Sequence, residues 1–269
     1  MKIFYNKKDL TSALNYEKNV GFIPTMGALH RGHISLIKKS RLQCNKTILS
    51  IFINKPQFNK SNDFKNYPRN LRYDINLIKK NKVDYLYIPN SKQIYPRGRN
   101  KKIKINSFHK KLCGKFRPNH FHAVVDVVSR FVKIINPKKI YLGEKDFQQL
   151  LIIKDYFKKE KINTEVITCK TVREKNGIPY SSRNLRLTGN EKKIISKTYN
   201  FIRKNKKSFI RKKIKRKIII KTIHSFGVNK IDYVKILDVN KIIKPFLKKK
   251  KYKIFLAYYI NKVRLIDNI

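Results

Sequence analysis

Two histidines three residues apart, His30 and His33, carry the strongest chemical signal in the sequence. They belong to a segment that directly follows an apolar run and reads Pro24-Thr25-Met26-Gly27-Ala28-Leu29-His30-Arg31-Gly32-His33. Both imidazoles can face one ligand, and beside a triphosphate they can stabilise charge that develops at phosphorus. Glycine lets the backbone approach a phosphate, and free N–H groups at a helix start attract one. The segment therefore predicts a nucleotide site rather than a zinc site, for which no Glu or Cys cluster completes the shell.

The surrounding elements must place this segment at the end of a strand. Apolar runs predict strands at 20–24, 47–53, 83–88, 139–142 and 164–170, and helices from 32 onward and at 73–80, 126–135 and 145–157. This alternation predicts a doubly wound, Rossmann-like α/β fold, a parallel sheet with helices on both faces. Such sheets bind ligands at the carboxyl ends of their strands, where the two histidines would lie. The helix from 32 is expected to bury Ile34, Ile37 and Leu42.

The composition changes after about Thr188. No acidic residue lies between Glu191 and Asp232. A lysine-rich helical stretch is expected at 191–216, followed by strand-like segments at 233–236 and 254–259. We therefore predict a Rossmann-like domain of residues 1–176 and a smaller α+β domain of residues 177–269.

The formal net charge of +50 comes from 66 Lys and Arg against 16 Asp and Glu. Such a balance suggests a nucleic acid or an anionic membrane as partner. However, the basic residues are mostly Lys, spread along the whole chain among many Ile and Asn, which an AT-rich coding sequence produces by itself. No RNP motif or zinc-finger spacing is present. We expect no specific nucleic acid partner, while weak non-specific RNA binding would follow from the charge alone.

The chain also lacks the marks of a membrane or secreted protein. No apolar run approaches the roughly 20 residues that cross a bilayer, and the first residues do not resemble a signal peptide. Cys44, Cys113 and Cys169 are far apart in the sequence, which argues against a disulfide framework. A cytoplasmic location and no membrane partner are expected.

Further motifs follow in order along almost the whole chain. They are Ser50-Ile51-Phe52-Ile53-Asn54, Gln57-Phe58, Tyr67-Pro68-Arg69, Ile94-Tyr95-Pro96, Arg117-Pro118, His120-Phe121, Gly143-Glu144-Lys145-Asp146-Phe147-Gln148-Gln149, Arg173-Glu174, Gly177, Ser181-Ser182-Arg183-Asn184 and Arg264-Leu265-Ile266-Asp267-Asn268. With the histidine segment, this set closely resembles the pantothenate synthetase family of the HxGH nucleotidyltransferase superfamily. The resemblance implies an ATP-dependent condensation of (R)-pantoate with β-alanine through a pantoyl adenylate, releasing AMP and pyrophosphate.

The resemblance also implies a role for each matched segment. It implies ATP binding by Met26, Gly27, Ala28, Leu29, His30, Arg31, Gly32, His33, Gly143, Glu144, Lys145, Asp146, Val172, Tyr180, Ser181, Ser182 and Arg183. It assigns pantoate and β-alanine to Asn54, Gln57 and Gln149, and catalysis to His30, His33 and Lys145. It further implies a homodimer, and Mg²⁺ that arrives with ATP instead of occupying a resident metal site.

The residue types suit these roles. Lys145 supplies a point charge for phosphate oxygens, and Asp146 can orient a ribose hydroxyl or Mg²⁺. Gln57 and Gln149 are neutral, so they would hold pantoate without damping its nucleophilic carboxylate. Ser181-Ser182-Arg183 offers hydroxyls and a guanidinium fork to a polyphosphate, whereas two serines alone would equally suit a helix cap. Because this segment follows the expected hinge, the small domain would have to close over the cleft as a lid.

Four positions depart from the family pattern. Lys55 stands where a proline is usual, and Pro56 follows it. Asn119 and Ala123 replace glycines, and of the two Asn adopts positive φ more readily. Asn176 replaces an aspartate before Gly177. None of these changes removes an expected ligand.

Two other functions stay open from the residues alone. Another adenylyltransferase of the same superfamily would share the two histidines, but it would not require Gln57, Gln149 or the terminal motif. A basic RNA-binding protein on a decayed enzyme fold would show salt-dependent RNA affinity without turnover.

Overall fold

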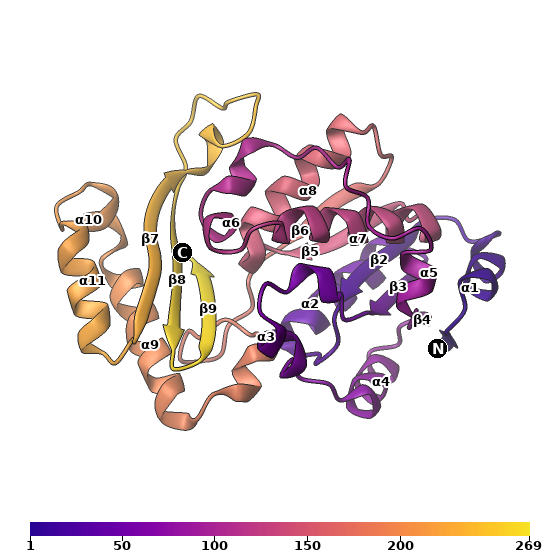
Figure 1. Ribbon diagram of the computed structural model, residues 1–269, viewed down its shortest axis with the longest axis horizontal. Coiled ribbons are helices and arrows are strands. Elements are labelled where there is room, and N and C mark those ends of the chain that lie inside the picture. Colours follow the sequence, from indigo (N-terminus) through magenta and orange to yellow (C-terminus); the bar gives the residue numbers. More distant parts are fainter.

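A six-stranded parallel sheet organises the first two-thirds of the chain (Figure 1), in a computed structural model that describes residues 1–269. Its strands are β1 (Lys2–Phe4), β2 (Val20–Thr25), β3 (Lys46–Ile51), β4 (Tyr85–Tyr87), β5 (Lys139–Gly143) and β6 (Glu165–Cys169). Their order is β1-β4-β3-β2-β5-β6, so β2 pairs with β3 on one side and with β5 on the other. The strand order reverses between β2 and β5, which is the switch point where such folds bind ligands.

Helices cover both faces of this sheet. They are α1 (Lys7–Leu14), α2 (Arg31–Gln43), α3 (Ser61–Lys65), α4 (Leu71–Lys80), α5 (Ser91–Ile94), α6 (Cys113–Phe116), α7 (His120–Ile135) and α8 (Phe147–Lys159), with 3₁₀ turns η1 (Lys55–Gln57), η2 (Ser107–Lys110) and η3 (Glu144–Asp146). Side-chain alternation along β2 sends Phe22 into the larger apolar core with α1, α7 and α8. Its neighbour Ile23 enters the opposite core with α2 and α4. The predicted fold class is confirmed.

A three-stranded antiparallel sheet and three helices form the C-terminal third. The elements are η4 (Ser182–Arg186), α9 (Gly189–Lys204), α10 (Lys206–Ile210), α11 (Arg216–Ser225), β7 (Lys230–Asp238), η5 (Val239–Lys241), β8 (Tyr252–Ile260) and β9 (Val263–Asn268). Figure 1 shows this sheet standing between α9–α11 and the large domain. Phe255 and Ala257 of β8 join the core of the large domain, whereas Ile254 and Leu256 pack with α9 and α11. Both faces of the small sheet are therefore buried.

One local expectation is wrong and another is refined. The helical stretch expected at 191–216 consists of α9 and α10, with α11 following separately, and not of one continuous helix. Ile202, Phe209 and Ile219 enter one core, whereas a continuous helix would spread them over about 25 Å. Leu42 is 85% exposed, because Leu36 lies on the buried stripe of α2 instead. None of the helices combines the length and the apolar character that a membrane-spanning helix needs.

Candidate active site

The carboxyl ends of β2 and β5 border a cavity of about 200 Å³ at the switch point. The expected site residues in its walls are Met26, His30, His33, Asn54, Gln57, Lys145, Asp146, Gln149, Ser181, Ser182 and Arg183. An adjoining cavity of about 140 Å³ adds Gly32, Gly143, Val172 and Tyr180. The structure thus brings segments that are distant in the sequence to one edge of the sheet.

Five residues expected to bind ATP do not line these two cavities. Leu29 belongs to the apolar core under α2, Arg31 is exposed at the start of α2, and the Glu144 carboxylate pairs with Lys253. None of these three lines either of the two cavities. The remaining two, Gly27 and Ala28, line a cavity of about 440 Å³ that shares Met26 and Phe52 with the first cavity.

The two histidines hold each other in place at the start of α2. His30 Nδ1 accepts from the Gly32 N–H at 3.1 Å, and His33 Nδ1 accepts from the His30 N–H at 3.3 Å. The rings stack with their centroids 4.0 Å apart. Since Nδ1 is the acceptor in both rings, a neutral imidazole must carry its hydrogen on Nε2. Each ring therefore has one N–H donor left for a ligand.

Both histidines are neutral at neutral pH. Burial, and then the nearby Lys145, lower the pKa of His30 to about 4, although Asp146 opposes the shift. Burial, His30 and Lys145 hold the pKa of His33 well below its usual value. The pair can thus donate hydrogen bonds from Nε2 without carrying a positive charge.

A buried carboxylate on α4 fixes the turn before the histidines. Asp74 is 1% exposed and accepts from the N–H groups of Ala28 at 2.8 Å and Leu29 at 2.7 Å. Burial raises the pKa of Asp74, and these two hydrogen bonds oppose the rise. Both Gly27 and Ala28 have positive φ, at 77° and 49°. The two N–H bonds stabilise this left-handed turn, which any residue other than glycine adopts at a cost.

This arrangement corrects the expectation of free backbone N–H groups around the helix start. The N–H groups of Ala28, Leu29, His30 and Gly32 all bind protein acceptors. The two histidines line the cavity, and their Nε2–H groups, and not these amides, are the donors left for a ligand.

Neutral amides line the same cavity beyond the histidines. Asn54 donates from Nδ2 to Gln57 Oε1 at 3.0 Å and accepts from the Tyr95 hydroxyl at 2.8 Å. Gln149 enters the wall from the first turn of α8. This group offers hydrogen bonds but no charge, which suits a hydroxy acid whose carboxylate must react.

Two further residues hold the backbone of Gln57 and were not assigned a role from the sequence. Arg117 Nη2 donates to the Gln57 carbonyl at 3.1 Å, and His120 Nδ1 contacts the same oxygen at 2.9 Å. Both side chains line the cavity. They stand in a matched motif, so the signal was present, but the motif alone did not say what they contact.

The expected polyphosphate segment is already engaged with protein groups. Ser181 caps η4 by accepting from the Arg183 N–H at 3.4 Å, and Ser182 donates to the Ala28 carbonyl at 3.0 Å. Arg183 forms an ion pair with Asp63 at 2.7 Å. Ser181 therefore acts as a cap, whereas Ser182 does not, and all three residues line the cavity.

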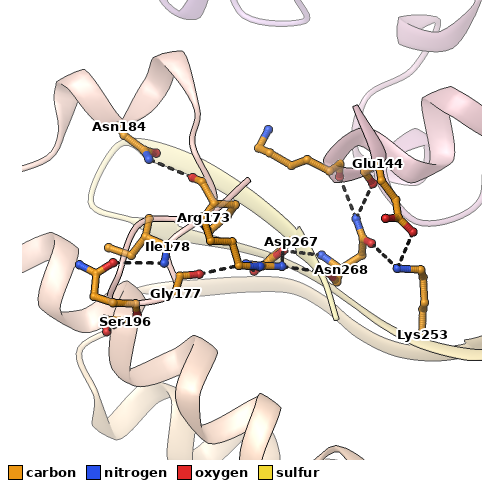
Figure 2. A network of polar contacts seen from close by, with 12 residues as sticks. Glu144, Arg173, Gly177, Ile178, Asn184, Ser196, Lys253, Asp267 and Asn268 are labelled. Atoms are coloured by element: carbon orange, nitrogen blue, oxygen red, sulfur yellow. Dashed lines mark hydrogen bonds and ion pairs between the residues drawn. The ribbon is translucent and has the colours of Figure 1, made fainter. Parts of the chain in front are cut away.

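The last strand holds the loop that carries Lys145, as Figure 2 shows. Asn268 Nδ2 donates to the carbonyls of Glu144 and Lys145, both at 2.9 Å. Lys253 Nζ lies 3.0 Å from Asn268 Oδ1 and 3.0 Å from the Glu144 carboxylate. The C-terminal domain thus fixes a loop of the large domain directly.

The connector between the domains is tied to the same strand. Arg173 forms a bidentate ion pair with Asp267 at 2.7 and 2.8 Å and also donates to the Gly177 carbonyl at 3.0 Å (Figure 2). Its guanidinium lies over the Tyr199 ring of α9, 4.4 Å from the centroid. Bidentate, partly buried pairs of this kind restrict orientation strongly.

The departures from the family pattern leave the site intact. Asn119 has a φ of 59°, in the left-handed region that Asn tolerates. Ala123 lies inside α7, fully buried, where no positive φ is needed. Lys55 and Pro56 form η1, the turn that presents Gln57.

We expect His30 to titrate near pH 4 in the folded protein, far below the usual 6.5. Between about pH 6.5 and pH 4, His30 is protonated in the unfolded chain but not in the folded chain. The free energy of unfolding therefore decreases as the pH falls through this range. A proton NMR titration checks this, with the His30 signal identified by its loss in His30→Gln. A midpoint near 6.5 would contradict the neutral pair.

We expect Asn268→Ala to lower the free energy of unfolding by about 1–3 kcal/mol, because two partly enclosed carbonyls lose their donor. Urea unfolding measures the change. Asn200→Ala in α9 is the control, since Asn200 makes only one long bond, 3.4 Å to Ser196. Equal stabilities of the two variants would show that the Asn268 contacts do not fix the loop.

Comparisons with known proteins agree with this geometry. The sequence profile of the Pantoate-beta-alanine ligase family matches residues 2–269. The chain is 39% identical to a pantothenate synthetase of Flavobacterium psychrophilum and 40% identical to one of Francisella tularensis subsp. novicida, covering 100% of this chain and 99% and 97% of those proteins.

Solved structures are similar over the whole chain as well. A pantoate-β-alanine ligase from Francisella tularensis, complexed with β,γ-ATP and β-alanine, has a TM-score of 0.89 at 40% identity, over 100% of this chain and 97% of that one. A pantothenate synthetase from Thermus thermophilus has a TM-score of 0.89 at 29% identity, over 100% and 99%. This chain belongs to the pantoate-β-alanine ligase family.

Proposed function

We propose that this protein condenses (R)-pantoate with β-alanine at the expense of ATP, through a pantoyl adenylate. The observation that carries the proposal is the pairing of two neutral histidines with a group of neutral amides around one cavity. The histidines suit a nucleotide whose α-phosphorus gains charge, and the amides suit a carboxylate that must stay nucleophilic.

In the first step, a pantoate carboxylate oxygen attacks the α-phosphorus of ATP. A P–O bond forms, the bond to the β-phosphate breaks, and pyrophosphate leaves with the electron pair. The Nε2–H donors of His30 and His33 and the ammonium of Lys145 stabilise charge at the phosphoryl oxygens. Asn54, Gln57 and Gln149 hold pantoate.

In the second step, β-alanine attacks the acyl carbon of the bound pantoyl adenylate. Its ammonium first loses a proton, because only the neutral amine is a nucleophile. The new C–N bond forms as the C–O bond to AMP breaks, and AMP leaves with the electron pair. The amide nitrogen then loses a second proton, and pantothenate is released.

Mg²⁺ belongs to this proposal as part of the ATP substrate. Asp146 lines the cavity beside Lys145, and its side chain is 45% exposed. One exposed carboxylate fits Mg²⁺, which keeps several waters and binds through one or two carboxylates plus substrate phosphates. When bound, the ion neutralises charge on the phosphates.

The same proposal extends to residues 177–269 as a domain that closes over residues 1–176. The support is the set of contacts from Ser182 to Ala28 and from Asn268 to the Lys145 loop. Closure would keep water from the mixed anhydride.

We also propose a homodimer in the cytoplasm without a specific nucleic acid partner. The three buried free cysteines fit a reducing compartment.

An assay of nucleotide products tests the reaction. With pantoate and MgATP the protein should form AMP and pyrophosphate, and with β-alanine added it should form pantothenate continuously. His33→Ala should lower the rate by about 10²–10³-fold, the effect of losing one preorganised donor. Activity that remains at the wild-type level in the purified variant would reveal a contaminating enzyme. Formation of ADP, or formation of AMP without pantoate, would contradict the proposed reaction.

A further inference from the structure

Several cations meet in a small cavity where the two domains touch. Arg117, Arg183, Arg264 and Lys145 line this space of about 80 Å³. Arg117 and Lys145 also line the larger cavity that holds the histidines. The small cavity is therefore a side chamber of the candidate active site, not a separate surface feature.

Arg117 is the member of this group that lacks a carboxylate. Arg183 pairs with Asp63 at 2.7 Å, and Arg264 pairs with Asp232 at 2.8 Å. The guanidinium of Arg117 donates only to a backbone carbonyl, that of Gln57. Burial, and then repulsion by Arg183 and Arg264, lower the pKa of Arg117 to about 10, although Cys113 and Asp63 oppose the shift without pairing with Arg117. A cation enclosed in this way is stabilised when an anion binds beside it.

The place of Arg117 limits which anion this is. Its hydrogen bond to Gln57 sets the guanidinium beside the amides proposed for pantoate. ATP phosphates have their own cation in Lys145 and their own wall in the segment from Ser181 to Arg183. The pantoate carboxylate is the group that reacts, so it is not the one to be held by a salt bridge. Among the substrates of the proposed reaction, the carboxylate of β-alanine remains without a cationic partner, because the resemblance gives β-alanine only neutral amides.

We propose that Arg117 binds the carboxylate of β-alanine and directs the amine toward the acyl carbon of the pantoyl adenylate. This inference rests on the proposed function. A guanidinium fork can hold a carboxylate bidentately and so fix the direction in which the chain of the substrate extends.

Arg117→Gln tests the inference by separating the two half-reactions. Exchange of labelled pyrophosphate into ATP needs pantoate but no β-alanine, so it reports the first step alone. The substitution should raise the KM for β-alanine about 10–100-fold, the loss expected for a hydrogen bond between charged groups. The effect on pantoate-dependent exchange should be smaller by at least about tenfold. His120 still contacts the Gln57 carbonyl, so that oxygen keeps a partner.

A substrate without the carboxylate completes the test. With propylamine in place of β-alanine, wild-type protein should lose about as much kcat/KM as Arg117→Gln loses with β-alanine, and the variant should discriminate little between the two amines. Arg99→Gln is the control for net charge. Arg99 is exposed and lines neither the cavity that holds the histidines, nor the cavity adjoining it, nor the side chamber. If Arg117→Gln does not fold, Arg117→Lys should show a smaller rise in KM, since a lysine keeps the charge but loses the fork.

An unchanged KM for β-alanine in a folded variant would overturn the assignment. A variant with a raised KM for pyrophosphate in the exchange reaction and an unchanged KM for β-alanine would show that Arg117 binds pyrophosphate. That result would also overturn the assignment. Absence of pantoate-dependent exchange in wild-type protein would overturn the proposed function itself, which is a different result.

Discussion

The two hydrogen bonds that Asp74 accepts from Ala28 and Leu29 are the contacts on which the site depends. They hold a left-handed turn between β2 and α2 that the backbone would not keep by itself. Because α2 begins directly after this turn, the turn sets where the two histidines point. Those histidines in turn accept from the first N–H groups of the helix, which fixes Nε2–H as the free donor on each ring. A buried carboxylate on α4 therefore sets the turn from which the two histidines orient each other.

The second half of the site is held from the other domain. The loop after β5 carries Lys145, and Asn268 of β9 binds two carbonyls of this loop. The small sheet packs one face against the large domain and the other against α9 and α11. This packing places β9 next to the loop that Asn268 binds. In this arrangement the terminal strand contributes Arg264 to the side chamber and positions Lys145 through Asn268.

Local sequence patterns predicted most of the sheet, and the family resemblance supplied most of the residues in the cavity walls. Apolar runs placed β2, β3, β5 and β6, and the rule for switch points placed both histidines near Lys145. The short β1 and the terminal β9 were not recognised, since β1 has three residues and β9 is half-polar in pattern. Asp74 left no local signal at all, because an aspartate in an amphipathic helix is ordinarily a solvated residue. Its role, like that of Arg117 and Asn268, is a long-range contact that periodicity does not encode.

The most direct test of this account is the rate of pantoate-dependent pyrophosphate exchange in Asp74→Asn. The amide keeps the volume but turns a donor toward one of two N–H groups, so the turn should relax and the exchange rate should fall at least about tenfold. Asp84→Asn is the matched control, since Asp84 also accepts from a backbone N–H, that of Thr47 at 2.8 Å, at the start of β3. A folded Asp74→Asn protein that exchanges as fast as Asp84→Asn would contradict the account.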